Sequence, residues 1–251
     1  MTWDRYLEAF HAERPGITES VLRRARDGGS DPYEWLAEVV PPPGRVLDLG
    51  CGSAPLFRLL AGRSWIGLDT SAAELAAARA AGAGPLLRAP ASAIPLRDAS
   101  VDVVVCSMSL MVTTPLLPVI AEITRVLRPG GLLAATIPAT GPLLPLDLVA
   151  VAGLIAALGR APAYPAGRDA PRIPALLAGH GLRVTSDSRR RFGYRLCLAA
   201  GADQFLSALY LPGTPAARCR LARGYLRFLA LLRYEMPVPL RRITAERPGR
   251  S

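Results

Sequence analysis

Two acidic residues and two glycines are spaced as in a nucleotide-type binding site. Asp48 comes two positions before Gly50, and Gly50 with Gly52 makes a Gly-x-Gly turn after a short apolar run. Glycines at such a turn let the backbone approach a ligand, and a helix that begins there offers free N–H groups. Asp69 follows 21 positions after Asp48, at the end of the next apolar run. A carboxylate there can accept both hydroxyls of a ribose.

A nicotinamide enzyme is the first alternative for this turn. Its Gly-x-Gly-x-x-Gly fingerprint needs a glycine where this chain has Pro55. Proline has no N–H and cannot give the same close packing of helix on strand. The Asp48 carboxylate would also repel a pyrophosphate, whereas it could orient donors around the amino-acid part of a cationic sulfonium ligand. Both differences favour S-adenosylmethionine as the cofactor.

Strand-length apolar runs alternate with helix-length segments around these residues. The expected strands cover 46–49, 65–68, 86–87, 101–106 and 132–137, and the expected helices cover 56–60, 74–80 and 116–127. This alternation predicts βαβ units, and therefore a parallel sheet with right-handed crossovers. The continuous apolar run at 101–106 is typical of a central strand that is covered on both faces.

The segments before and after this alternation are expected to add helices and further strands to a single domain over 1–251. Residues 1–42 are predicted as a helical N-terminal lid, in which Asp31 caps a helix and Pro32 takes its first position. Residues 43–140 form the cofactor-binding core. The Ala-, Leu- and Pro-rich residues 141–180 are predicted as a cap insertion, and 181–251 as C-terminal strands and helices that complete the sheet.

Four motifs in order resemble the class I S-adenosylmethionine-dependent methyltransferases of the small-molecule "methyltransferase domain" type. They are VLDLGCGSA, WIGLDTS, AIPLRDASVDVVVCSMSL and ITRVLRPGGLLAATIP, all within residues 43–138. The resemblance implies an α/β fold with a doubly wound, mostly parallel, Rossmann-like sheet of seven strands, the last of them antiparallel. It also implies transfer of a methyl group from S-adenosylmethionine to an acceptor.

The resemblance assigns roles at the first two motifs. The residues that would line the methionine end of the cofactor are Asp48, Gly50, Cys51 and Gly52. Asp69 would hold the ribose, with Thr70 beside it. The adjacent Ser71 is the better candidate for capping the next helix, which leaves Asp69 available to the ligand.

The later motifs supply the adenine and methyl ends of the same site. Ser107 and Met108, at the end of the fourth strand, would lie under the methyl group and face the acceptor. Family members often carry an acid that binds the adenine amino group, but this chain has Pro90 there. Adenine would therefore be bound by backbone groups near Ala91 or by the Ser92 hydroxyl.

Only two histidines could serve as a general base for a hydroxyl acceptor. His11 lies on the N-terminal lid and is our candidate catalytic residue. His180 lies in a turn before an apparent strand, which predicts a place remote from the site. Tyr6, Glu13 and Arg14 lie on the same segment as His11 and could equally contact cofactor or acceptor.

The acceptor pocket is expected between the N-terminal lid, the apolar segment 143–158 and the helix that carries Tyr225. Its apolar composition with Arg nearby suits a small hydrophobic or aromatic molecule, with room for an acidic group. Two alternatives stay open: an RNA methyltransferase, and a non-catalytic S-adenosylmethionine-binding protein. Cys106 to Ser109 is not the Asn/Asp-Pro-Pro-Tyr motif of enzymes that methylate base amino groups, so nucleic acid is not the expected partner.

The composition of the 251-residue chain fits a cytoplasmic globular protein. The formal net charge is +10, and all thirty basic residues are Arg. Because these arginines are spread along the chain, we attribute them to a solvated surface rather than to an RNA site. No metal site is expected, because the four cysteines form no Cys-x-x-Cys pair and there is no histidine cluster. The apolar run 143–158 is too short for a standard membrane span, and the expected assembly is a monomer or a homodimer.

Overall fold

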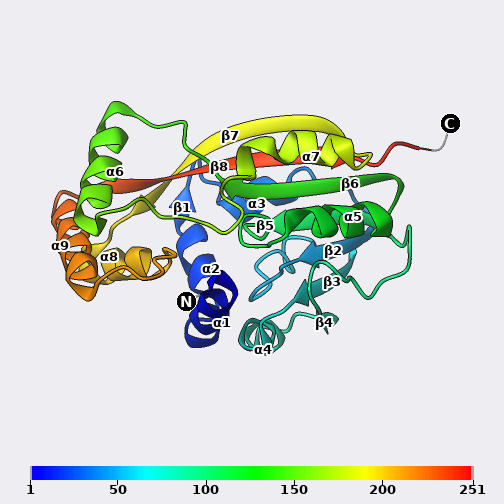
Figure 1. Cartoon of the computed structure of the whole chain (residues 1–251), viewed down its shortest axis with the longest axis horizontal. Helices are drawn as coiled ribbons and strands as arrows, with labels where there is room; N and C mark the ends of the chain where they lie inside the picture. Colours follow the sequence, from blue (N-terminus) through cyan, green and yellow to red (C-terminus); the bar gives the residue numbers. More distant parts are fainter. Residues whose placement is uncertain (1, 250–251) are drawn as a thin grey trace.

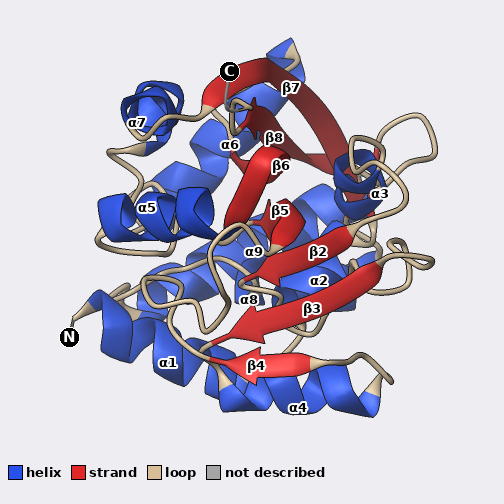
Figure 2. Ribbon diagram, turned by 90° about the vertical axis from the view of Figure 1, so that its right-hand side faces the viewer, coloured by secondary structure: helices blue, strands red, loops and turns tan. Residues whose placement is uncertain are grey.

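An eight-stranded, mostly parallel sheet forms the centre of the computed structural model, which describes residues 2–249 (Figures 1 and 2). Its strand order is β1-β7-β8-β6-β5-β2-β3-β4. The strands are β1 (Ala25–Arg26), β2 (Arg45–Leu49), β3 (Ser64–Asp69), β4 (Leu86–Arg88), β5 (Val101–Ser107), β6 (Leu127–Pro138), β7 (Arg183–Arg195) and β8 (Glu235–Glu246).

The pairing confirms the predicted doubly wound sheet. β2 to β6 pair in parallel, while β8 lies antiparallel between β6 and β7. The sheet has eight strands rather than seven because the two-residue β1 adds to the outer edge, where Ala25 pairs with Tyr194. This order places the carboxyl ends of β2, β3 and β5 side by side, which is where ligands bind in open α/β sheets.

Helices cover both faces of the sheet. The helices are α1 (Trp3–Glu13), α2 (Ile17–Leu22), α3 (Pro32–Ala37), α4 (Ala72–Ala80), α5 (Leu116–Val126), α6 (Pro145–Leu158), α7 (Ile173–Gly179), α8 (Leu198–Ser207) and α9 (Ala216–Leu231), with a short 3₁₀ turn, η1 (Ala170–Arg172). On one face, α5 and α7 share a buried cluster with Leu47 and Val104. On the other face, α2, α3 and α4 share a cluster with Val46 and Val103. Alternate residues of β2 and β5 therefore enter different cores, as expected of central strands.

The helix expected at 56–60 is wrong. The segment forms a series of turns. The hydrogen bond from the Leu60 N–H to the Leu56 carbonyl (2.9 Å) spans four residues, as in an α-helix, but the neighbouring backbone hydrogen bonds span three. Ala54 before it has φ 62°, and Pro55 offers no N–H. The chain therefore leaves β2 through the glycine loop and a left-handed Ala54 and continues in turns rather than in a regular helix.

Segments 141–180 and 181–251 contribute to two different parts of the molecule. α6 packs on α9, and α8 also packs on α9, so these three helices lie together at one end of the long axis (Figure 1). α7 instead lies beside α5 over the sheet. Among residues 2–249, no helix has both the length and the apolar character needed to cross a bilayer.

Candidate active site

A cavity of about 670 Å³ opens at the carboxyl ends of β2, β3 and β5, beneath α1. Its size falls within the range of ligand and cofactor pockets, ~300–1,000 Å³. The eleven residues that the sequence assigned to the site all line this one cavity: His11, Asp48, Gly50, Cys51, Gly52, Asp69, Thr70, Ala91, Ser92, Ser107 and Met108. The structure thus brings together four loops that are far apart in the sequence.

Both glycines of the first loop have left-handed backbone angles. Gly50 has φ 71°, and a Cβ added to it would lie 2.5 Å from Cβ of Ser109. The Ser109 hydroxyl donates to the Leu49 carbonyl (2.8 Å), which fixes the loop after β5 against the loop after β2. Gly52 has φ 52°, and its N–H donates to Oδ2 of Asp69 (2.9 Å). Both positions favour glycine because of their left-handed backbone, and Gly50 is also needed for the close approach to Ser109.

The Asp48 carboxyl is buried beside this loop without a hydrogen-bond partner. Its side chain is 1% exposed, and both of its oxygens are unpaired among the described residues, as is the Trp65 indole N–H. Burial raises the pKa of Asp48 to about 8; the nearby Trp65 indole N–H opposes this shift without forming a well-aligned hydrogen bond, and the Asp69 charge adds to it. An unpaired buried acid at a cavity wall is costly unless a ligand supplies donors or positive charge. The ammonium and sulfonium groups of S-adenosylmethionine fit this requirement.

Asp69 is held by two backbone N–H groups at the end of β3. Its Oδ2 accepts from Gly52, and its Oδ1 accepts from Ser71 (2.8 Å). Burial raises its pKa, and these two hydrogen bonds oppose that shift. The Ser71 hydroxyl, which accepts from the Glu74 N–H, is the N-cap of α4. Asp69 thus keeps free lone pairs that could accept from ribose hydroxyls.

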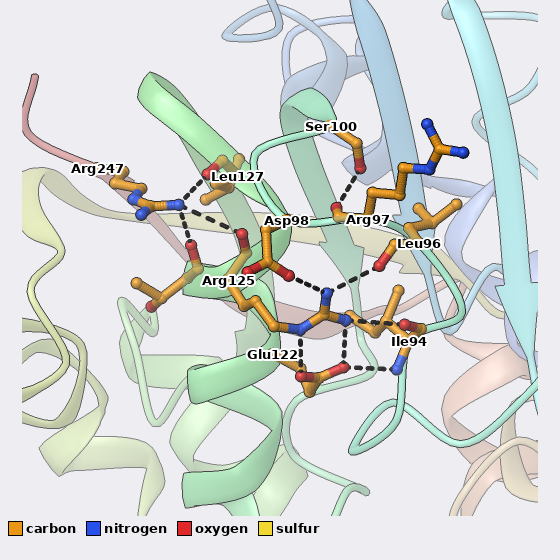
Figure 3. A network of polar contacts seen from close by, with 10 residues as sticks. Ile94, Leu96, Arg97, Asp98, Ser100, Glu122, Arg125, Leu127 and Arg247 are labelled. Atoms are coloured by element: carbon orange, nitrogen blue, oxygen red, sulfur yellow. Dashed lines mark hydrogen bonds and ion pairs between the residues drawn. The ribbon is translucent and has the colours of Figure 1, made fainter.

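Ala91 and Ser92 lie on the loop between β4 and β5, which a network centred on Arg125 ties to α5 (Figure 3). The Arg125 guanidinium pairs with Glu122 (2.6 Å) and Asp98 (2.7 Å) and donates to the Leu96 and Ile94 carbonyls. These acids raise the pKa of Arg125, and Arg125 lowers the pKa of Glu122. The network fixes the loop whose earlier part faces the cavity.

We expect Arg125→Ala to destabilise the protein by about 1–3 kcal/mol, because it leaves two carbonyls and two carboxylates without their shared donor. The value is modest because the guanidinium is partly exposed and solvent screens its ion pairs. Urea unfolding would measure the change in the free energy of unfolding. Arg97→Ala is the matched control, since Arg97 lies on the same loop and its side chain takes part in no ion pair within residues 2–249. Equal stability of the two variants would contradict the assigned role of the network.

Ser107 and Met108 lie where β5 ends at the cavity. The Ser107 hydroxyl lies 3.5 Å from the Thr136 hydroxyl, and the Met108 N–H donates to the Thr136 carbonyl (2.9 Å). Met108 has φ 57°, a left-handed conformation that is strained for a long side chain. The neighbouring strand β6 therefore holds this strained turn in place at the cavity wall.

His11 is bound at both ring nitrogens. Its Nδ1 lies 2.9 Å from Oε1 of Glu74, and its Nε2 lies 3.1 Å from the Tyr210 hydroxyl. Glu74 is 4% exposed, and its Oε2 accepts from the Gly16 N–H (3.0 Å). The arrangement in which Nδ1–H donates to the carboxylate leaves Nε2 to accept from the phenol. Burial raises the pKa of Tyr210, so its hydroxyl stays protonated.

Sequence reasoning missed Glu74 and Tyr210 as site residues. Glu74 looks like an ordinary first-turn acid of a helix, and Tyr210 lies 199 positions from His11. Tyr210 belongs to an aromatic cluster with Phe10 and Met111, which Met108 also contacts. Nothing in the spacing of these residues signals that they meet, because only the tertiary fold brings them together.

The predicted contribution of 143–158 and of the Tyr225 helix to the acceptor pocket is wrong. The cavity is lined by no residue of α6 or α9. The Tyr225 hydroxyl instead donates to the Ala150 carbonyl (3.2 Å) and joins these two helices. Tyr210, which lies between α8 and α9, extends the pocket wall that α1 forms, because it packs on Phe10 and contacts His11. Nδ1–H of His180 donates to the Leu176 carbonyl (2.8 Å) of the preceding helix, and His180 is absent from the cavity lining, as predicted.

The cavity is strongly acidic although the chain is basic. Six acidic side chains line it, from Asp4, Glu8, Glu19, Asp48, Asp69 and Glu74, of which Asp48 is mostly protonated at neutral pH because of its raised pKa. The single arginine among the lining residues is Arg88, which donates to the Thr70 carbonyl (3.1 Å). The arginines expected near an acidic acceptor group are therefore elsewhere. Such a lining favours cationic and neutral ligands over anionic ones. Among residues 2–249, no cluster of three or more metal-ligating side chains is present.

Comparison with known proteins agrees with the geometry. Residues 47–135 match the family model described as "Methyltransferase domain". The malonyl-[acyl-carrier protein] O-methyltransferase of Methylococcus capsulatus is 33% identical over 124 residues, which are 46% of this chain and 45% of that protein. The enzyme of the same name from Enterobacter lignolyticus is 39% identical over 95 residues, which are 37% of this chain and 38% of that protein. The chain thus spans less than half the length of these curated relatives.

Solved structures share the fold at low sequence identity. A SAM-dependent methyltransferase from Methanosarcina mazei has a TM-score of 0.57 and 16% identity, over 88% of this chain and 100% of that chain. The [4+2]-cyclase SpnF has a TM-score of 0.57 and 19% identity, over 98% of this chain and 93% of that chain. Residues 47–135 thus match a methyltransferase domain, and the motifs and the sheet order agree with the class I fold, for which S-adenosylmethionine is the expected cofactor.

Proposed function

We propose that this class I S-adenosylmethionine-dependent methyltransferase methylates a small, neutral or cationic acceptor with an apolar or aromatic body. The observation that carries the proposal is the cavity where the unpaired Asp48 carboxyl, the Gly50–Gly52 loop and Asp69 meet the aromatic cluster around Tyr210. The loop and the two acids would hold the cofactor. Tyr210, backed by the buried Phe10, would hold the acceptor beside Met108.

The acidic lining of the cavity argues against a malonyl group, which the names of the relatives give as their acceptor. A malonyl group carries a free carboxylate, and such a group needs a cation beside it when it leaves water. Arg88 is the one arginine of the cavity lining, and it is the last residue of β4, three positions before Ala91. Beside Met108, the cavity wall offers the Tyr210 ring and hydroxyl, the Thr113 side chain and the apolar Val112 instead. This composition suits a phenol, an alcohol or an amine.

The bound cofactor supplies an electrophilic methyl group on a sulfonium, and orientation of the acceptor in line with it provides much of the rate. In this proposal, the proton that the acceptor loses passes through Tyr210 to His11. The Tyr210 oxygen takes the acceptor proton as its own proton passes to Nε2 of His11. The Glu74 carboxylate holds Nδ1–H and stabilises the imidazolium that forms. The N-terminal helix α1 would act as the lid that excludes water from this exchange.

A transfer assay tests the proposal directly. The protein is incubated with deuteromethyl S-adenosylmethionine and a metabolite extract, and labelled products are identified by mass spectrometry. We expect deuteromethyl ethers of phenols or alcohols, or deuteromethylated amines. Labelling confined to malonyl thioesters would overturn the acceptor class. Binding of the cofactor by calorimetry without any labelled product would overturn the enzymatic role.

Once an acceptor is found, we expect His11→Ala and Tyr210→Phe each to lower kcat by about a hundredfold or more, because each removes a member of the proton path. The affinity for S-adenosylmethionine should change little, since neither hydrogen bond is made to the loops after β2 and β3. Steady-state kinetics and calorimetry would measure the two quantities. His180→Ala is the control and should keep full activity. An unchanged kcat in both variants would remove His11 from its proposed role.

The four cysteines support a reducing compartment as the place of this reaction. All four are free thiols, two of them buried in the core at Cys51 and Cys106. Free thiols of this kind are typical of the cytoplasm. We therefore place the proposed activity in the cytoplasm.

A further inference from the structure

Helix α6 is apolar on all sides, yet only one stripe of it is buried. Its buried residues are Asp147, Ala150, Leu154 and Leu158. On the outside, Leu146 is 71% exposed and Val149 is 67% exposed. A helix that is hydrophobic all round is normally buried on all sides. The outer face of α6 therefore lacks a covering element within residues 2–249.

Helix α9 carries two apolar stripes. Ala222, Leu226 and Leu229 form the buried one. Leu221, Phe228 and the capping residue Leu232 form the other, and each is more than half exposed. Their spacings of seven and four positions place these three side chains on one face of the helix. This second stripe contributes nothing to the core or to the cavity.

Arginines flank the exposed stripe of α9. The helix has Arg218, Arg220, Arg223 and Arg227 and no acidic residue. Asp203 of α8 pairs with Arg223 (3.4 Å) and Arg227 (2.6 Å). In the described part of the chain, no carboxylate lies within 4.0 Å of a guanidinium nitrogen of Arg220 or of the following Arg233. The surface around the stripe is therefore net positive.

The two helices are packed closely into one tip of the molecule, which we call the α6–α9 tip. The Tyr225 ring lies against Gly153, where an added Cβ would come within 2.3 Å of the phenol oxygen. The Tyr225 hydroxyl also donates to the Ala150 carbonyl. Figure 1 shows α6 and α9 together at one end of the long axis, away from α4. The exposed side chains thus project from a rigid end of the molecule.

We propose that the α6–α9 tip binds peripherally to a membrane surface that contains anionic lipids. Projecting Leu, Val and Phe side chains can enter the boundary between headgroups and acyl chains, while arginines pair with lipid phosphates. A second copy fits less well, because a two-fold interface would place this positive patch against itself. An acidic protein partner would need an enclosed groove for its anchors, whereas the hollow beside Arg220, Leu221 and Tyr225 is open to solvent.

Vesicle sedimentation of the full chain tests this proposal. The probes are vesicles of phosphatidylcholine alone and of phosphatidylcholine mixed with phosphatidylglycerol. We expect sedimentation with the mixed vesicles, and release as NaCl is raised. The triple variant Leu221→Ser/Phe228→Ser/Leu232→Ser should stay in solution. Arg220→Gln/Arg233→Gln should weaken binding by about fivefold for each charge removed.

Matched controls change the same residue types elsewhere. Leu117→Ser removes an exposed leucine from α5, and Arg58→Gln/Arg97→Gln removes two exposed charges. Both controls should bind as the unchanged protein does, and melting curves should show all variants folded. Three results would overturn the proposal: no sedimentation with mixed vesicles, binding to immobilised polyglutamate in place of vesicles, or a dimer in light scattering that the triple variant dissociates.

Discussion

Gly50→Ala is expected to abolish binding of S-adenosylmethionine and to lower the free energy of unfolding by about 3 kcal/mol. Two costs add at this position. The backbone has φ 71°, which alanine adopts with strain, and the new methyl group would lie 2.5 Å from Cβ of Ser109. To relieve the overlap, the loop after β2 must move away from the loop after β5. Calorimetry with the cofactor and urea unfolding would measure the two effects.

Two further variants separate strain from overlap. Gly62 also has a left-handed φ of 83°, but an added Cβ there meets no atom within 4 Å. Gly62→Ala should therefore cost about 1 kcal/mol and leave cofactor affinity unchanged. Adding Ser109→Gly to Gly50→Ala removes the overlapping atom and should restore part of the binding. If Gly50→Ala behaved like Gly62→Ala, the close approach of the two loops would play no part in cofactor binding.

The second large effect concerns the pH dependence of cofactor affinity through Asp48. The pKa of its buried carboxyl is raised to about 8, against an ordinary value of 3.8. A cationic ligand binds the ionised form better, so the Kd for S-adenosylmethionine should fall as the pH rises toward 8, by at most about tenfold per pH unit. Above that pH the carboxyl is ionised in the free protein and this contribution levels off. Calorimetric titrations across this range would measure the Kd.

Asp48→Asn is the matched variant, because an amide resembles the protonated carboxyl in size and charge. At about pH 6 the two proteins should bind the cofactor with similar affinity, and near pH 8 the variant should bind at least about tenfold more weakly. The amino group of the cofactor titrates in both experiments, so the difference between the curves reports Asp48 alone. Parallel curves would contradict the proposed role.

The Asp48 carboxyl should have the opposite effect on the stability of the protein without cofactor, whose free energy of unfolding should fall as the pH rises. A folded-state pKa above the unfolded value means that the stabilisation is complete below about pH 4 and is lost as the pH rises toward 8. Asp48→Asn should remove this loss, because its side chain does not ionise. Urea unfolding at several pH values should therefore show a smaller decline for the variant than for the unchanged protein.

The cofactor half of the site could be predicted from sequence because its geometry is local. Each predicted residue lies at the end of a strand or in the turn that follows it, and parallel strands bring their carboxyl ends to one edge. Gly50, Asp69 and Met108 therefore meet once the strand order is known. The sequence motifs that resemble the family supply that order, and β8 between β6 and β7 confirms it.

The acceptor half could not be predicted in the same way. His11 meets Glu74 and Tyr210 through the packing of α1 on α4 and on the segment after α8, and no periodicity encodes those contacts. The apolar pattern of α6 and α9 suggests that they face the acceptor pocket, but one stripe of each helix is buried in the core and the rest faces solvent. An apolar stripe shows that a helix face has affinity for an apolar environment, and it does not identify that environment.

The position of β8 has a consequence for how the protein is made. Strands β6 and β7 are synthesised before β8, yet each pairs with β8 and neither pairs with the other. Until residues 235–246 leave the ribosome, both strands present open edges that can pair with other chains. The nascent chain must therefore be protected until its last strand arrives, and a truncation before Glu235 should leave a protein that aggregates rather than one that merely lacks an edge.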